Sequence, residues 1–100
     1  MAFTIKSIIN FNTIEVIPTW VWGEKKGNKV KIFRLEDNNL VSTKMTEFFT
    51  RRLSELLSGK TVELRNPQKV IDSDTIECEL FLDGVNVVNY FPDLSNTLIK

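Results

Sequence analysis

Hydrophobic and polar residues alternate through the first third of the chain, which is the pattern of half-buried β-strands. Residues 2–9 are apolar and β-branched, residues 13–17 alternate, and residues 29–35 follow a polar stretch at 23–28 that is flanked by glycines. Asparagine tolerates left-handed backbone, so residues 10–12 predict a tight turn between the first two strands. This part of the chain therefore predicts a three-stranded meander.

The pattern changes period over residues 45–57, where apolar residues recur at the spacing of one face of a helix. The stripe consists of Met45, Phe48, Phe49, Arg52, Leu53, Leu56 and Leu57, with the arginine as its one polar member. Ser42 or Thr43 can cap the start of this helix, and Ser58-Gly59 can end it. One amphipathic helix is expected after the meander.

Two further strands are predicted after the helix. Residues 61–65 alternate until residues 66–68 break the strand, and residues 75–82 alternate again. The inner face of this last strand is expected to hold Ile76, Cys78, Leu80 and Leu82. A turn then leads to a short C-terminal helix within residues 85–90. The order of elements is that of a five-stranded OB barrel, mainly β with one inserted helix, although a small α+β sheet domain has a similar pattern.

The composition adds limits to the function. One hundred residues correspond to a single domain spanning 1–100. The net charge is zero, which gives no support to nucleic-acid binding, since binders of that class usually carry a basic excess. The chain has no histidine, which excludes histidine catalysis and histidine-ligated zinc. The one cysteine, Cys78, is expected to be a small core residue.

The start of the chain lacks the charged and apolar regions of a signal peptide, and no run approaches the length of a membrane span. The sequence therefore predicts a cytoplasmic protein without membrane contact. No cofactor is expected.

Several short segments match one family in order and spacing. In chain order they are the turn at 10–13 followed by Ile14-Glu15-Val16, the segments 27–32 and 35–39, the leucine-glycine-lysine run at 56–64, and the strand and turn at 79–87. Together they cover roughly residues 3–90 and resemble the staphylococcal-nuclease (thermonuclease-like) family. The resemblance implies an OB barrel with the order of elements expected above.

The resemblance also implies a chemistry, namely hydrolysis of phosphodiesters with one calcium ion. In the family, aspartates hold the ion, because calcium prefers charged oxygen ligands. The aspartate of the first turn corresponds to Asn12, which has no charge. The aspartate after the third strand corresponds to Glu36, and Asp37 beside it is a second weak candidate ligand.

The family's remaining catalytic positions are also substituted. A glutamate acts as general base and two arginines hold the phosphate, because a guanidinium binds two oxygens at once. The base corresponds to Asn39, which cannot accept a proton at useful pH. The first arginine corresponds to Lys31 and the second to Thr75. The resemblance therefore implies a degenerate member that has lost its nuclease activity.

Aromatic and basic residues occur together at the end of the second strand. Trp20 and Trp22 share one face by alternation, and Lys25 and Lys26 follow them. With Lys31 and Arg34, they form the set that a barrel would use to stack bases and contact phosphates. Alternatively, both rings pack in the core or against a partner chain.

The leading hypothesis is a catalytically inactive binding module for single-stranded nucleic acid or for a protein. One alternative is a calcium-dependent nuclease with a site rebuilt from Lys31, Glu36 and Asp37. Another is a structural or assembly subunit, such as a homodimer with Trp20 and Trp22 in its interface.

Overall fold

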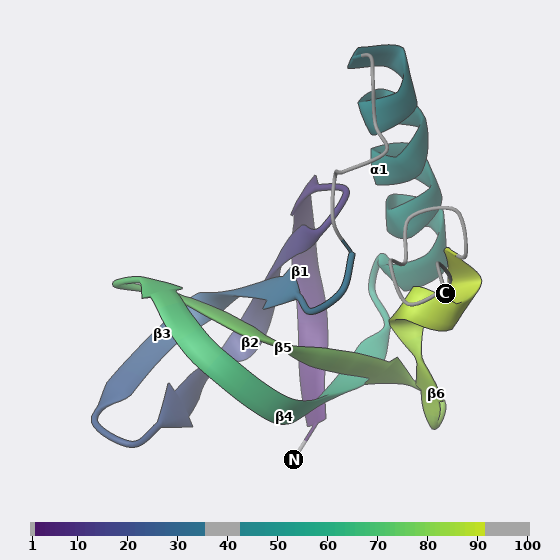
Figure 1. Cartoon of the computed structure of the whole chain (residues 1–100). Coiled ribbons are helices and arrows are strands. Elements are labelled where there is room, and N and C mark those ends of the chain that lie inside the picture. Colours follow the sequence, from purple (N-terminus) through teal and green to yellow (C-terminus); the bar gives the residue numbers. More distant parts are fainter. Residues whose placement is uncertain (1, 36–42, 92–100) are drawn as a thin grey trace, which may run out of the picture.

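The computed structural model describes residues 2–35 and 43–91. It is mainly β with one α-helix, as the sequence predicts (Figure 1). The elements are β1 (Ala2–Asn10), β2 (Thr13–Trp22), β3 (Lys25–Ile32), α1 (Thr43–Leu57), β4 (Thr61–Asp72), β5 (Thr75–Leu82), β6 (Val85–Asn86) and the 3₁₀-helix η1 (Val87–Tyr90).

The strands are hydrogen-bonded in the order β3-β2-β1-β4-β5-β6, and β3 pairs in addition with β5. That pairing is parallel, with Val30 opposite Ile76 and Ile32 opposite Cys78, whereas the other pairs are antiparallel. Starting at β3, hydrogen bonding therefore passes through β2, β1, β4 and β5 and returns to β3, so these five strands close into a ring.

Alternate side chains of the ring strands point inward and form the core. On β5 the predicted inner face, Ile76, Cys78, Leu80 and Leu82, is buried as expected. It belongs to one core with inner side chains of the other strands, among them Ile14, Val16, Val30, Ile32 and Val62.

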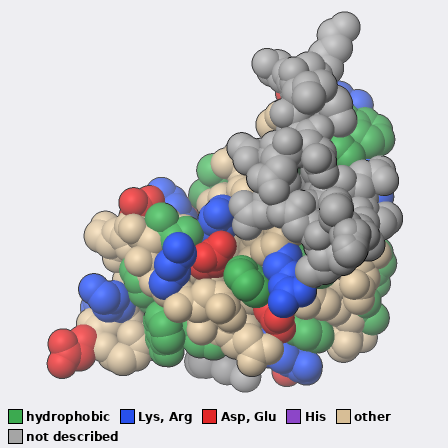
Figure 2. Space-filling model, in the orientation of Figure 1, with side chains coloured by type: hydrophobic (Ala, Val, Ile, Leu, Met, Phe, Trp, Pro, Cys, Tyr) green, Lys and Arg blue, Asp and Glu red, His purple; other side chains and the backbone are tan. Residues whose placement is uncertain are grey.

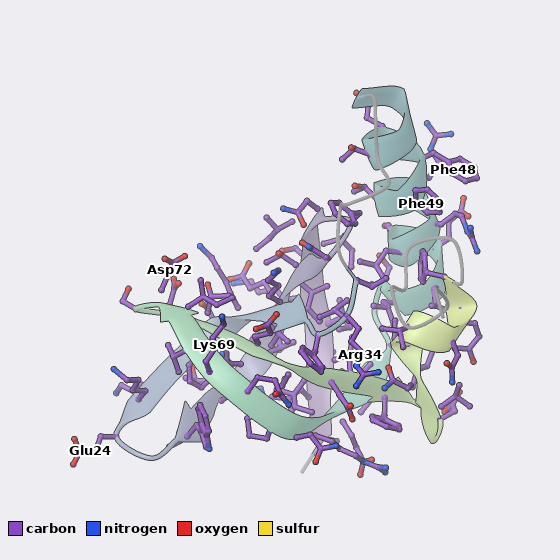
Figure 3. All side chains as sticks on the ribbon, in the orientation of Figure 1. Glu24, Arg34, Phe48, Phe49, Lys69 and Asp72 are labelled. Atoms are coloured by element: carbon purple, nitrogen blue, oxygen red, sulfur yellow. The ribbon has the colours of Figure 1, made fainter. Side chains whose placement is uncertain are left out.

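Helix α1 buries one side against the core and stands beside the C-terminal half of β1 (Figure 1). Phe49, Leu53 and Leu57 are buried, but Phe48 is 52% exposed and points away from the sheet (Figure 3). The predicted stripe was too wide at this residue, because Phe48 lies about 100° around the helix from Phe49. Gly59 ends the helix as expected, with a left-handed φ of 73°. Within the described residues, no helix combines the length and apolarity needed to cross a membrane.

The β2–β3 hairpin is longer than the sequence predicts. β2 continues from Ile17 to Trp22 and β3 begins at Lys25, so the turn is confined to Gly23 and Glu24. Lys25 and Lys26 are polar but pair with Trp22 and Val21, and their side chains are exposed on the extended ribbon. Residues 23–28 were predicted to form the hairpin tip, and the tip is shorter than that because β3 begins at Lys25 and not at Lys29.

The predicted break of the fourth strand at residues 66–68 is also wrong, since β4 runs without interruption to Asp72. The pairing with β5 shifts register between Arg65 and Lys69, and Asn66 has a φ of 53°. A bulge of this kind accommodates Pro67, which has no N–H to give to a ladder. The Asn66 amide also donates to a Glu79 carboxylate oxygen at 2.7 Å, which ties the bulge to β5.

The short helix predicted within residues 85–90 is only partly present. Residues 85–90 form the two-residue strand β6 and one turn of 3₁₀-helix, η1. The side-chain oxygen of Asn86 accepts a hydrogen bond from the Val88 N–H at 3.1 Å, which starts that turn.

Candidate functional site

The first position that the nuclease resemblance marks, Asn12, takes part in the internal bonding of the fold. Its side-chain nitrogen donates to the Leu35 carbonyl at 3.0 Å, and its side-chain oxygen accepts the Thr13 hydroxyl at 2.9 Å. Its own carbonyl accepts the Ile32 N–H at 2.7 Å. The amide of Asn12 therefore joins the β1–β2 turn to the end of β3.

We expect Asn12→Asp to destabilise the fold by about 1–3 kcal/mol, because a carboxylate loses the N–H donor and faces the Leu35 carbonyl oxygen. Urea unfolding at neutral pH measures the change. The matched control is Asn10→Asp, since Asn10 uses only its side-chain oxygen, as acceptor from the Asn12 N–H at 3.0 Å. Equal stability of the two variants would show that the Asn12 amide has no such role.

The second position, Lys31, lies on β3 opposite Thr13 on one side and Glu77 on the other. Its ammonium is 3.6 Å from a carboxylate oxygen of Glu77, whose side chain is only 8% exposed. Lys29, two residues earlier, is likewise 3.6 Å from Asp74. The positive charges at this end of β3 are therefore balanced by acids on and before β5.

The third described position, Thr75, is buried and its hydroxyl donates to the Asp74 carboxylate at 3.1 Å. It pairs with Lys29, so the strand register brings Asn12 in the β1–β2 turn, Lys31 on β3 and Thr75 on β5 to neighbouring positions. The other predicted site residues, Glu36, Asp37 and Asn39, lie outside the described residues. Over residues 2–35 and 43–91, no three acidic or cysteine side chains form a group able to hold a metal ion.

The basic residues singled out in the sequence are spread over the molecule. Arg34 is exposed, and its guanidinium lies 5.2 Å from the centre of the Phe33 ring. Lys25 and Lys26 lie on the β2–β3 hairpin, whose tip is Glu24 (Figure 3). On the face shown in Figure 2, lysine and arginine side chains are interspersed with aspartate and glutamate. The described cations therefore do not form a continuous basic patch on that face.

The two tryptophans differ in their surroundings. Trp20 is 2% exposed, and its indole N–H donates to the Lys29 carbonyl at 2.8 Å. Trp22 is 40% exposed, and Val21 between them is 72% exposed. The expected shared face is present, because both rings border one pocket. Only Trp22 offers substantial ring surface to a ligand.

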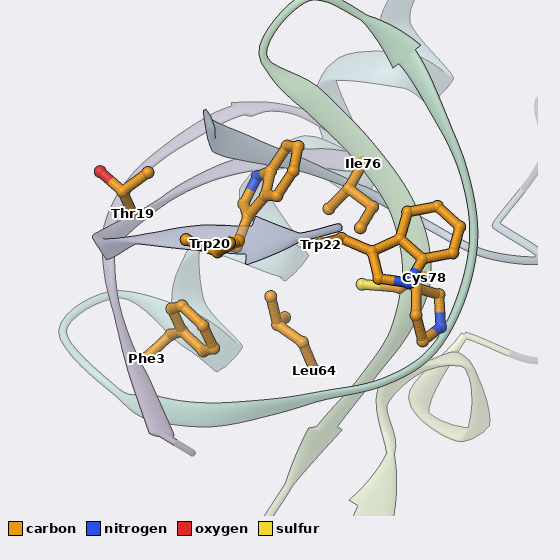
Figure 4. Close-up of a pocket in the computed structure, with 9 residues that line it drawn as sticks. Phe3, Thr19, Trp20, Trp22, Leu64, Ile76 and Cys78 are labelled. Carbon is orange, nitrogen blue, oxygen red and sulfur yellow. The ribbon is translucent and has the colours of Figure 1, made fainter. Parts of the chain in front are cut away.

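That pocket opens between the ring strands and has a volume of about 410 Å³. Its walls are residues 19–22 of β2 together with Phe3, Leu64, Pro67, Ile76 and Cys78, none of them charged (Figure 4). No residue of α1 borders it, and the start of β1, to which Phe3 belongs, is the end of that strand farther from the helix (Figure 1). Apolar walls and a volume of this size are typical of binding sites.

The pKa of the Cys78 thiol indicates that this part of the pocket wall is shielded from water. Burial first, and then the charges of Glu79 and Glu77, raise the pKa of the Cys78 thiol from 9.0 to about 12. The thiol therefore stays protonated at neutral pH, and the pocket wall carries no charge there. This agrees with the sequence expectation of a core cysteine rather than a nucleophile.

The raised pKa of Cys78 predicts a loss of stability in alkali. The unfolded chain releases the thiol proton near pH 9.0 and the folded chain near pH 12, so the folded state binds more protons between these values. The contribution of the protonated thiol to the free energy of unfolding is complete below pH 9.0, and it is lost as the pH rises from there to about 12. Urea unfolding across the window should show a steeper decline for the wild type than for Cys78→Ala. Parallel profiles would contradict the shift.

The sequence singled out two pocket residues, Trp20 and Trp22, but not the rest of the wall. Ile76 and Cys78 were correctly placed on the inner face of their strand. These two residues share the pocket wall with Phe3 and Leu64 because β1, β2 and β4 separate at one end of the ring. The alternation of apolar and polar residues does not predict where strands separate.

No family model matches the chain, and no curated protein matches it.

Proposed function

We propose that this chain is a catalytically inactive OB barrel of thermonuclease-like type that serves as a protein-binding module. The order of three strands, one helix and two strands, with a parallel pairing of β3 and β5 closing the ring, supports the OB assignment. The sequence resemblance supports the nuclease-like ancestry.

The loss of catalysis is supported by the state of the described family positions. Asn12 carries no charge and its amide is bonded to Leu35, so it is a poor calcium ligand. Lys31 is paired with a buried glutamate and lacks the forked donors of arginine. Thr75 is neutral and buried. Each lost transition-state donor costs about 3–4 kcal/mol, so the replacement of both arginines, together with the loss of a charged calcium ligand, removes most of the rate enhancement.

The apolar pocket is the observation that carries the binding function. It is uncharged, it is bordered by the exposed ring of Trp22, and Val21 beside it is 72% exposed. Exposed apolar surface around an apolar pocket is characteristic of protein interfaces, where an anchoring side chain fills such a space.

Single-stranded nucleic acid is less well supported than protein as the ligand. Stacking needs accessible rings, and Trp20 is buried with its N–H already bonded. Phosphate contacts need unbalanced cations, and Lys29 and Lys31 both face carboxylates.

A random-peptide display library panned on the full chain tests the proposal. We expect enriched peptides that bind the wild type and lose binding to Trp22→Lys, which puts a charge at the pocket. Tyr90→Lys is the matched control, because Tyr90 is a similarly exposed aromatic, 38%, on η1 and outside the pocket wall. An absence of enriched peptides, or peptides that bind both variants equally, would contradict the proposal.

A further inference from the structure

The ring has a gap beside the pocket, because β1 pairs with only part of its two neighbours. On β2, the pairing with β1 reaches Ile17, opposite Thr4. On β4, it covers residues 61–63, opposite Ala2, Phe3 and Thr4. Beyond these points, no strand among the described residues pairs with the outer edge of β2 or of β4.

The two unpaired edges border the pocket from opposite sides. Residues 19–22 of β2 form one wall, and Leu64 and Pro67 of β4 contribute to another. Backbone N–H and C=O groups along an unpaired edge are a template for a further strand. A strand in this gap would continue the line of β1 and, like β1, run antiparallel to β2.

Of the two edges, that of β2 is the better acceptor of a strand. Every residue from 19 to 22 has an N–H, whereas β4 carries Pro67, which has none, within its bulge. The bulge also shifts the register of β4 between Arg65 and Lys69. The proline instead adds apolar surface to the pocket wall.

We propose, on the basis of the protein-binding function above, that the occupant is an extended peptide segment of a partner protein, which adds a strand to the outer edge of β2 at residues 19–22. Side chains of an added strand alternate between its two faces. Uncharged apolar side chains of the segment enter the pocket against Trp22 and Leu64, since no wall residue can balance a charge.

The outward-facing side chains of the segment are acidic. Lys26 of β3 pairs with Val21 and shares its outward face, so it lies one strand away from the added strand, across β2. Lys69 lies on β4 across the gap and is exposed. Neither lysine has an ion-pair partner among the described residues, since Glu77, which is opposite Lys69, faces Lys31 instead. Glu24 and Asp72 lie at the tips of the hairpins (Figure 3). Carboxylates on the segment complement these two cations.

A short synthetic peptide in which aspartate alternates with valine and phenylalanine is the probe. We expect it to protect from hydrogen exchange those amides of residues 19–22 that face the gap, in the full chain. N-methylation of the peptide amides that face β2 should weaken binding about tenfold or more, because each removes one hydrogen bond and adds a clash. Replacing its aspartates by lysines should weaken binding several-fold at low salt, and less at high salt.

Separate outcomes distinguish the two proposals. If the peptide binds and Trp22→Lys weakens it, but N-methylation has no effect and the amides of residues 19–22 stay unprotected, strand addition is wrong and the binding module stands. If the lysine-containing peptide binds as tightly, the acidic preference is wrong. If neither this probe nor any displayed peptide binds, the protein-binding function itself fails.

Discussion

Trp20→Ala is expected to lower the free energy of unfolding by about 3–5 kcal/mol, the range for removing a large buried aromatic ring. Trp20 is 2% exposed and packs among the inner side chains of the ring. Its loss would leave a cavity and would remove the donor to the Lys29 carbonyl. Trp22→Ala, at a ring that is 40% exposed, should cost about 1 kcal/mol or less.

Urea unfolding of both variants measures this difference. Trp20→Phe separates the two contributions, since it keeps most of the packing and removes the N–H, and it should cost about 1 kcal/mol. Similar stability of Trp20→Ala and the wild type would mean that Trp20 is not part of the core. That result would also restore the hypothesis that the rings of Trp20 and Trp22 are both available to stack on nucleic-acid bases.

Gly27→Ala is the second substitution with a large expected effect. A Cβ at residue 27 would lie 2.4 Å from the Asp74 carbonyl oxygen and 2.7 Å from the Asp74 Cα. These are backbone atoms of the segment that pairs with β3, where the Lys29 N–H donates to Asp74 at 3.1 Å. The strands must separate to relieve the clash, so we expect a loss of about 1–3 kcal/mol.

Gly23→Ala is the matched control, because Gly23 lies in the same hairpin and a Cβ there meets nothing within 4 Å. Its positive φ of 66° alone should cost about 1 kcal/mol. If Gly27→Ala is no less stable than Gly23→Ala, then β3 does not approach Asp74 this closely and the closure of the ring needs revision.

Alternation and helical spacing predicted most of the fold. The order of elements, the inner face of residues 75–82 and the end of the helix at Gly59 all followed from local pattern. The fourth strand was misjudged, because the bulge around Pro67 is stabilised by a bond to Glu79 on a neighbouring strand. A long-range contact of this kind leaves no local signal.

The candidate site was predicted less well than the fold. The resemblance marked Asn12, Lys31 and Thr75 as substituted, and the sequence alone could not say what they bond instead. Two of those bonds reach residues that only the fold brings close, Leu35 for Asn12 and Glu77 for Lys31, whereas Thr75 bonds to the adjacent Asp74. The pocket also escaped prediction, since it depends on where β1 ceases to pair with β2 and β4.

Fluorescence anisotropy of a labelled single-stranded DNA tests the central claim most directly. The protein is added with calcium, the signal is followed over time at low and at high salt, and a chelator is added in a parallel series. We predict a flat trace under every condition, because Lys29 and Lys31 both face carboxylates and the described catalytic positions of the family are substituted. A steady rise at low salt would instead identify a nucleic-acid module, and a rise that decays unless calcium is chelated would identify an active nuclease with a rebuilt site.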